Sequence, residues 1–129
     1  MILAAGCFDG LSGPQVRYLQ AARRLDPWGT LIVTIVPDRY IREHKQRAPY
    51  WCQADRAHVV KSLGCVDDVY MQGEHETVPD VIRALEPETF VKGPEWQNHL
   101  DEEHMQACQD AGTEIVFTAD YGPHWSEVR

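Results

Sequence analysis

The fold is decided by residues 2–25, whose sequence is ILAAGCFDGLSGPQVRYLQAARRL. The first part, Ile2–Cys7, is a short apolar run that predicts a buried strand. After a glycine-bearing turn comes one apolar stripe at helical spacing, made of Val16, Leu19, Ala22 and Arg23, with Leu25 beyond. Asp26-Pro27 ends this helix, and the β-branched run Thr30–Val36 predicts a second buried strand before Pro37. The unit is therefore a strand, a helix and a parallel strand.

The same alternation continues along the sequence. Three more apolar stripes indicate helices, and each is followed by a short strand candidate. The helices are Gln53–Leu63, a stripe of Val78, Val81, Ile82 and Leu85, and a segment from about Asn98 that carries Leu100, His104, Cys108 and Ala111 and ends at Gly112; the strands are Asp67–Met71, Thr89–Val91 and Thr113–Thr118. We therefore predict an α/β fold, a single doubly wound Rossmann-like domain over residues 1–129 with a five-stranded, mostly parallel sheet and helices on both faces. Ligands of such sheets bind beyond the carboxyl ends of the strands, so the site should involve the turn after the first strand.

The stretch from Arg39 to Tyr50 fits no element and is either a functional loop or a frayed surface segment. It contains four of the twelve basic residues of the chain, namely Arg39, Arg42, Lys45 and Arg47. This cluster is either a solvated loop or a site for a small anion. The net charge of −8 argues against a dedicated nucleic-acid partner, because phosphate contacts need a basic surface.

Composition bounds the class of protein. With 129 residues, 43% of them hydrophobic, the chain suits one folded domain. Its apolar runs are far shorter than the roughly 20 residues of a membrane-spanning helix, so we expect no membrane partner and no signal peptide. The four cysteines form no C-x-x-C pair, which favours reduced thiols and a cytoplasmic location. His99 and His104 are five positions apart, not four, and we expect no protein-built metal site.

The turn that precedes the first helix has the chemistry of an anion site. Backbone N–H groups at a helix N-terminus point beyond the strand, and the helix dipole favours negative charge there. Helix capping accounts for the same residues, with Ser12 as the cap and Pro14 in the first helical turn. The turn alone therefore does not identify a function.

Seven segments in order carry a family resemblance over most of the chain. They are Gly6-Cys7-Phe8-Asp9, Val16-Arg17-Tyr18-Leu19, Lys45 to Pro49, Trp51 to Ala57, Val66-Asp67-Asp68-Val69, Ile82 to Pro87 and Phe90 to Trp96. Together they resemble the nucleotidyltransferases of the cytidylyltransferase-like group, especially glycerol-3-phosphate cytidylyltransferase and the heptose adenylyltransferase domain. The motifs of that family include G-x-F-D-x-x-H-x-G-H, I-x-x-x-x-P and V-K-G-x-x-W.

The resemblance implies transfer of a nucleoside monophosphate from ATP or CTP to a phosphate-bearing sugar or polyol, with release of pyrophosphate. Mg²⁺ would be carried in by the nucleotide, and a homodimer is implied because relatives often form one. The implied catalytic residues are Ser12, Gln15, Lys45 and Arg56. The implied nucleotide- or phosphate-binding residues are Gly6, Phe8, Asp9, Arg47, Lys92, Gly93, Trp96, His124 and Ser126. Four aromatic residues belong either to an interface or to the core: Trp28, Tyr50, Trp51 and Trp125.

Two motifs depart from the family pattern. The H-x-G-H positions hold Ser12, Gly13, Pro14 and Gln15, so the two imidazoles that would neutralise charge on the α-phosphate are replaced by neutral donors. Losing one such donor costs about 10²- to 10³-fold in rate. The last motif, similar to G-I-S-T-T in the family, is here residues 122–126, where His124 is a candidate donor.

Two functions remain open on these observations. The chain is either a divergent nucleotidyltransferase or a protein that binds a nucleotide or phosphosugar, in a regulatory role, without turnover. Three of the candidate residues also have structural alternatives. Asp9 could cap the turn, Arg56 could pair with an acid on a neighbouring helix, and Trp96 could cover the sheet edge.

Overall fold

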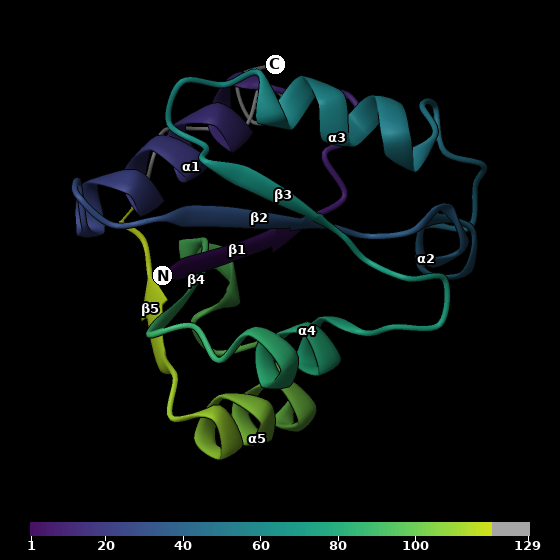
Figure 1. Cartoon of the computed structure of the whole chain (residues 1–129). Coiled ribbons are helices and arrows are strands. Elements are labelled where there is room, and N and C mark those ends of the chain that lie inside the picture. The colour runs from purple at the N-terminus through teal and green to yellow at the C-terminus, as the bar shows by residue number, and fades with distance from the viewer. Residues whose placement is uncertain (120–129) are drawn as a thin grey trace.

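Within residues 1–119, the part of the chain that this computed structural model describes, five strands form a parallel sheet (Figure 1). Their order across the sheet is β3-β2-β1-β4-β5. The strands are β1 (Ile2–Gly6), β2 (Leu31–Ile35), β3 (Asp68–Met71), β4 (Thr89–Lys92) and β5 (Glu114–Phe117). Every paired strand is parallel to its neighbour, which confirms the predicted sheet.

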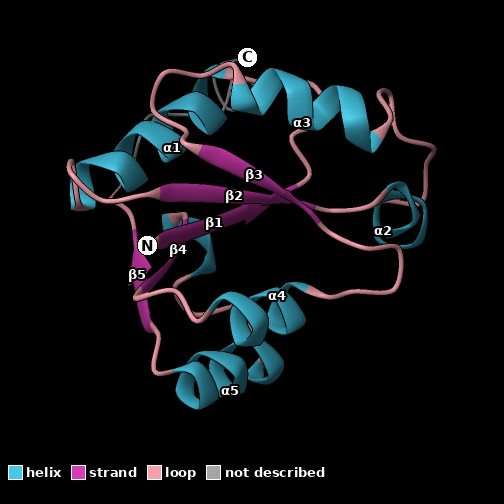
Figure 2. Ribbon diagram, viewed as in Figure 1, coloured by secondary structure: helices cyan, strands magenta, loops and turns pink. Residues whose placement is uncertain are grey.

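Helices cover both faces of the sheet (Figure 2). On one side lie α1 (Gly13–Leu25) and α3 (Gln53–Lys61), and on the other α4 (Val78–Leu85) and α5 (Glu102–Ala111). The short helix α2 (Asp38–His44) follows β2, and the 3₁₀ turn η1 (Pro94–Trp96) follows β4. No helix within residues 1–119 combines the length and the apolar character needed to cross a membrane.

The alternating residues of β1 divide the core into two layers. Ile2 and Ala4 pack with α1 and α3, whereas Leu3 and Ala5 pack with α4 and α5. Successive side chains of a strand point to opposite faces, and this central strand is covered on both. The continuous apolar run that predicted a buried strand therefore reflects a position between two helical layers.

The strand order reverses beside β1. The chain passes from β1 to β2 and β3 on one side and then returns to place β4 on the other side of β1. In a doubly wound sheet this reversal opens a crevice at the carboxyl ends of the two strands, where ligands bind. Here those ends are Gly6-Cys7 and Lys92-Gly93.

Two local predictions need correction. Part of the unassigned stretch forms α2. Ile41 is the buried residue of this helix, so the sequence has no apolar stripe that would predict it. The last helix begins at Glu102 and not near Asn98, because the Asp101 carboxylate accepts a hydrogen bond from the His104 N–H and caps the helix there. Gly112, with φ of 70°, ends that helix as predicted.

Candidate functional site

The positive charges of four basic side chains of the described residues act on the thiol of Cys7, and we name these side chains the cation cluster: Lys45, Arg47, Arg56 and Lys92. Burial raises the pKa of the Cys7 thiol, and the positive charges of all four act in the opposite direction. Cys7 directly follows β1, so the cluster lies at the crevice where the strand order reverses. Three separate segments of the sequence supply it, because Lys45 and Arg47 lie in the same loop between α2 and α3.

Asp9 holds the loop between α2 and α3 against the turn after β1. Its carboxylate accepts hydrogen bonds from Arg47 Nη1 at 2.7 Å, from the Tyr50 N–H at 2.9 Å and from the Trp51 N–H at 3.0 Å. Only 2% of the Asp9 side chain is exposed. Burial alone would raise the pKa of this carboxyl, but the three hydrogen bonds and the Arg47 charge outweigh it and lower the pKa.

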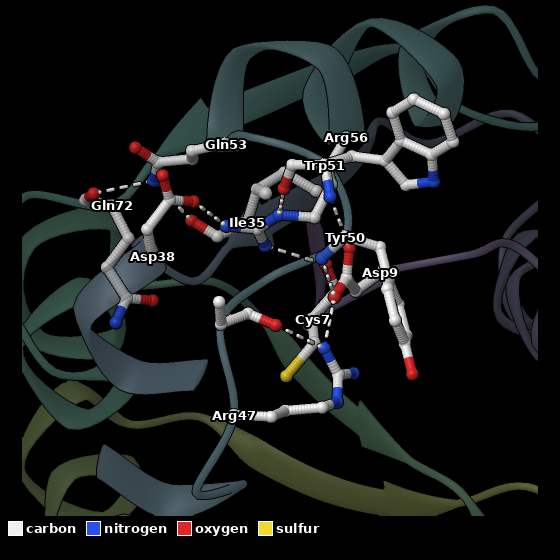
Figure 3. A network of polar contacts seen from close by, with 11 residues as sticks. Cys7, Asp9, Ile35, Asp38, Arg47, Tyr50, Trp51, Gln53, Arg56 and Gln72 are labelled. Carbon is white, nitrogen blue, oxygen red and sulfur yellow. Dashed lines mark hydrogen bonds and ion pairs between the residues drawn. The ribbon is translucent and has the colours of Figure 1, made fainter. Parts of the chain in front are cut away.

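Arg56 joins three segments from inside the protein. With 1% of its surface exposed, it donates from Nη1 to the Cys7 carbonyl (2.8 Å) and from Nε to the Trp51 carbonyl (3.0 Å). Its Nη2 donates to Asp38 Oδ1 at 2.8 Å, as Figure 3 shows. The neighbouring-helix partner considered for Arg56 is thus Asp38 of α2. These contacts suit a positioning residue, and a catalytic role for Arg56 stays a prediction.

Gln53, a residue for which no role was predicted, links two further strand ends. Its Nε2 donates to the carbonyls of Ile35 and Gln72, each at 2.8 Å (Figure 3). Ile35 is the last residue of β2, and Gln72 directly follows β3. The Gln53 amide, at the first position of α3, therefore ties the ends of β2 and β3 to this helix. In the sequence, only the place of Gln53 directly after Trp51-Cys52 could have indicated this role.

Lys92 ends β4 with its ammonium over the Trp96 ring, 4.4 Å from the ring centroid. Burial lowers the pKa of Lys92 to about 8, with the positive charge of Lys45 acting in the same direction. Trp96 is 39% exposed, and its ring lies against the Lys92 ammonium. Gly93 between them is buried, and its carbonyl accepts from the Trp96 N–H to start η1.

The positions of the two family histidines lie at the start of α1. The Gln15 side-chain oxygen accepts a hydrogen bond from the Ser12 N–H at 3.0 Å, so Gln15 turns back to cap the helix. Pro14 is buried in the first turn. The structural role predicted for Ser12 and Pro14 is therefore present, while catalytic roles for Ser12 and Gln15 stay predictions.

Gly6 and Phe8 shape the turn itself. A Cβ at Gly6 would lie 2.8 Å from the Phe8 ring, which only a glycine permits. Phe8 has a positive φ of 50° and is 4% exposed, so the chain reverses sharply here while the ring stays in the core. We conclude that these two residues set the position of the Cys7 carbonyl that Arg56 reaches.

Two cavities flank the cluster. One of about 310 Å³ lies between the turn after β1 and α3, lined by Phe8, Gly10, Leu11, Trp51, Asp55, Arg56, His58 and Val59. The other, of about 250 Å³, is lined by Pro37, Asp38, Arg39, Arg42, Gln53 and Glu74. The basic stretch is thus divided, because Arg39 and Arg42 line the second cavity, whereas the charges of Lys45 and Arg47 act on Cys7.

Several predicted features need separate mention. His124, Ser126 and Trp125 lie outside the described residues. Trp28, Tyr50 and Trp51 are 97%, 70% and 57% exposed, so the core alternative is wrong for these three. In the part of the chain that the structure describes, no three His, Cys, Asp or Glu side chains gather closely enough to hold a metal ion.

Comparisons with known proteins agree on one family. A family model described as Cytidylyltransferase-like matches residues 3–123. The bifunctional protein HldE of Trichlorobacter lovleyi is 36% identical over 97 residues, 74% of this chain but 19% of that protein. The FAD synthase of Pyrococcus horikoshii is 32% identical over 94 residues, 73% of this chain and 62% of that protein. The chain thus spans about a fifth of the length of HldE.

A solved structure supports the fold. The lipopolysaccharide core biosynthesis protein of Thermoplasma volcanium superposes with a TM-score of 0.76. The superposition covers 94% of this chain and 97% of that chain at 22% sequence identity. At this identity the similarity concerns the arrangement of strands and helices.

Proposed function

Because the chain belongs to the cytidylyltransferase-like family, we propose that it binds a nucleoside triphosphate at the cation cluster and transfers the nucleoside monophosphate to a phosphate-bearing acceptor. Pyrophosphate is the second product. The observation that carries the proposal is that the charges of Lys45, Arg47 and Lys92 all act on Cys7 at the end of β1, beside the reversal of strand order, in a chain of net charge −8. Such a reaction depends on positioning and on neutralising charge on the phosphate oxygens.

The cluster also suits a polyphosphate chain because two of its cations are held by carboxylates and the other two are not. Arg47 and Arg56 are paired with Asp9 and Asp38 and shape the site. For Lys45 and Lys92 no carboxylate of residues 1–119 forms such a pair. Mg²⁺ would enter with the nucleotide as part of the substrate, its oxygen ligands being the phosphates. The lysines would then contact the remaining phosphate oxygens.

The acceptor belongs to one of two classes in this proposal. The family resemblance favours a sugar or polyol phosphate, and the similarity to an FAD synthase favours a flavin mononucleotide. The cavity of about 310 Å³ beside the cluster has a mainly apolar wall that includes Phe8 and Trp51, and it would hold the part of a ligand that carries no phosphate.

Binding without turnover is the second candidate, because a specific observation favours it. The positions of both family histidines are occupied by Ser12 and Gln15, and the Gln15 oxygen is used to cap α1. The described part of the site thus has no imidazole at this turn to support the leaving pyrophosphate. A protein of this kind would bind the same ligands in a regulatory role.

The test is calorimetric titration of ATP and of CTP, each with Mg²⁺, into the purified chain and into Lys45→Ala and Lys92→Ala. The matched control is Lys61→Ala, since Lys61 is exposed and pairs with Asp68 away from the cluster. We expect saturable binding to the wild type and the control, and a loss of tenfold or more in each cluster variant. Absence of saturation with both nucleotides would reject the proposed function.

A second measurement separates transfer from binding. Pyrophosphate release is followed with glycerol 3-phosphate, sugar 1-phosphates and FMN as acceptors, each with the nucleotide that binds. Acceptor-dependent release supports the transferase, and saturable binding with no release by any acceptor supports the binding protein. We also propose a cytoplasmic location, supported by the four unpaired thiols, and a homodimer, supported by the exposed Tyr50 and Trp51. Light scattering on a sizing column tests the dimer.

A further inference from the structure

The cavity of about 250 Å³ beyond β2 and β3 has no part in the proposed function. Pro37 and Asp38 reach it from the end of β2, Gln53 from the start of α3, and Glu74 from the loop after β3. Ligands of parallel sheets bind at this edge, beyond the carboxyl ends of the strands. The cavity is therefore a second candidate site, and none of the side chains that line it belongs to the cation cluster.

A network of buried polar side chains fixes one wall of this cavity. Thr34 is 0% exposed and Gln72 is 3% exposed. Thr34 Oγ1 donates to Gln72 Oε1 at 3.2 Å, and Gln72 Nε2 donates to the Glu76 carbonyl at 2.8 Å. The Gln72 carbonyl in turn accepts from Gln53 Nε2. Buried amides are tolerated only when they are hydrogen-bonded, and a satisfied network of this kind is rigid. The wall is thus preformed, as a ligand site requires.

This wall presents hydrogen-bond acceptors that the described residues leave unused. Gln53 Nε2 donates both of its hydrogens, to the carbonyls of Ile35 and Gln72, so the orientation of the Gln53 amide is fixed. Within residues 1–119 no group donates to Gln53 Oε1. The Asp38 carboxylate accepts from Arg56 through Oδ1 and has no such partner at Oδ2. Figure 3 shows Asp38 and Gln53 together on one side of Arg56.

The charges around the cavity cancel, because Arg39 and Arg42 are matched by Asp38 and Glu74. Arg39 is paired with Glu43 at 2.7 Å, and Asp38 is neutralised as described above. The side chains of Arg42 and Glu74 form no hydrogen bond or ion pair with any other residue in the described part of the chain. One cationic and one anionic group therefore remain available at the same cavity.

We propose that this cavity binds a small zwitterion, a molecule with one carboxylate and one protonated amine, such as an α-amino acid. The Arg42 guanidinium presents parallel N–H donors that match a carboxylate. The ammonium of the ligand has three donors, and Glu74 and Gln53 Oε1 are the acceptors for them. A ligand with a single charge would leave either Arg42 or Glu74 without a partner. The proposal does not depend on the proposed function, since it involves no nucleotide.

Three molecules that share a hydroxyethyl group separate the contributions of the two charges. L-serine carries both charges, ethanolamine lacks the carboxylate, and 3-hydroxypropionate lacks the ammonium. Each is titrated into the complete ¹⁵N-labelled chain, and the side-chain N–H signals of Gln53 and Arg42 are followed by NMR. Gln53→Glu and Arg42→Lys assign these signals by removing them. L-threonine and L-glutamine serve as larger zwitterions.

We expect L-serine to shift both signals with a dissociation constant of about 1 mM or lower. Ethanolamine and 3-hydroxypropionate should each bind at least tenfold more weakly. If 3-hydroxypropionate or ethanolamine binds as tightly as L-serine, the cavity selects a single charge and the proposal is wrong. If none of the three amino acids produces a saturable shift of either signal, the proposal is rejected.

Charge-removing variants test which groups make the contacts. Arg42→Gln and Glu74→Gln should each weaken L-serine binding by tenfold or more, and both should fold because these side chains are exposed and unpaired in residues 1–119. The matched controls are Arg24→Gln in the last turn of α1 and Glu102→Gln in the first turn of α5, which should bind L-serine as the wild type does. If Lys92→Ala loses L-serine binding and Arg42→Gln keeps it, the amino acid is bound at the cation cluster and the assignment of this cavity is overturned.

Discussion

Asp9 Oδ2 and Arg47 Nη1 lie 2.7 Å apart, and this ion pair joins the turn after β1 to the loop after α2. The Arg47 guanidinium also lies over the Tyr50 ring, 4.3 Å from its centroid. The loop that brings Lys45 to the site is therefore anchored by a single buried carboxylate. Its stability should depend on that carboxylate more than on any surface contact of the loop.

Asp9→Asn should lower the free energy of unfolding by about 2 kcal/mol, because the amide removes the charge and its NH₂ group must face at least one of the three donors. Urea unfolding at pH 7 measures it. Asp68→Asn, which breaks an exposed pair with Lys61, should cost much less than Asp9→Asn. Because the pKa of Asp9 is lowered on folding, the difference between wild type and Asp9→Asn should be full above pH 5 and should shrink as pH falls below 4. A difference that does not change with pH would contradict this assignment.

Arg56→Met should destabilise the protein by about 3 kcal/mol or more, since it leaves two carbonyls and Asp38 without their donor inside the protein. Arg56→Lys should recover only part of this loss, because one ammonium cannot reach three acceptors in the same geometry. Thermal unfolding followed by circular dichroism is the measurement. Arg83→Met is the control, as Arg83 forms an exposed pair with Asp110. Equal melting temperatures for Arg56→Met and the wild type would refute a positioning role for Arg56.

Lys92→Met should stabilise the protein by about 1 kcal/mol at pH 7, since it removes a charge that burial disfavours while losing one contact with Trp96. The pKa of Lys92 is lower in the folded protein than in the unfolded chain. The stability of the wild type should therefore rise between pH 8 and 10.5 relative to the variant, and the advantage of Lys92→Met should disappear there. Guanidinium unfolding at several pH values measures both effects, with Lys61→Met as the control. A Lys92→Met variant less stable than the wild type at pH 7 would show that the charge of Lys92 does not destabilise the folded protein.

Gly6→Ala should destabilise the protein by about 1 to 3 kcal/mol, because the new methyl group would lie 2.8 Å from the ring of Phe8. Gly64→Ala is a suitable control, since no heavy atom lies within 4 Å of a Cβ placed there. Chemical unfolding of both variants gives the comparison. If the loss at Gly6 is a clash with the ring, adding Phe8→Leu to Gly6→Ala should cost less than the sum of the two single changes.

Restoring the family motif tests why the turn differs. The double variant Ser12→His with Gln15→His should lose about 0.5 to 1 kcal/mol of stability, because the Gln15 cap is removed. If the remainder of the site supports transfer, pyrophosphate release should rise by about 10²-fold or more, as expected for charged donors at the phosphate. Kinetic assays at matched nucleotide saturation decide this. An unchanged rate in a folded double variant would show that the missing imidazoles are not what limits transfer.

Much of the fold could be predicted from the sequence, because the strands are short apolar runs bounded by residues such as proline and glycine that end strands and helices. Thr30–Val36 was predicted as a strand and β2 spans Leu31–Ile35, and Val78–Leu85 carries the stripe predicted for a helix. The helix α2 could not be predicted, since Ile41 is its single buried residue. The location of the site, at the end of the first strand, could be predicted because ligands of parallel sheets bind at the carboxyl ends of the strands.

The pairings within the site were not predictable. Sequence order does not reveal that Asp9 accepts three hydrogen bonds from residues 38 to 42 positions away, or that Arg56 reaches the Cys7 carbonyl. Such contacts depend on the exact approach of loops that are far apart in sequence. Lys92 illustrates the opposite case, since a lysine at the end of a predicted strand is poorly explained by packing and lies at the edge of the sheet where ligands bind.

The central place of β1 also bears on how the protein is made. Residues 1–35 can form a strand, a helix and a second strand during synthesis, but β1 pairs with β4 only after residues 89–92 have left the ribosome. Until then one edge of an apolar strand has no partner, and such an edge can pair with other chains. Slow translation between β2 and β4 should therefore favour aggregation of the nascent chain, and chaperones that shield strand edges should raise its yield.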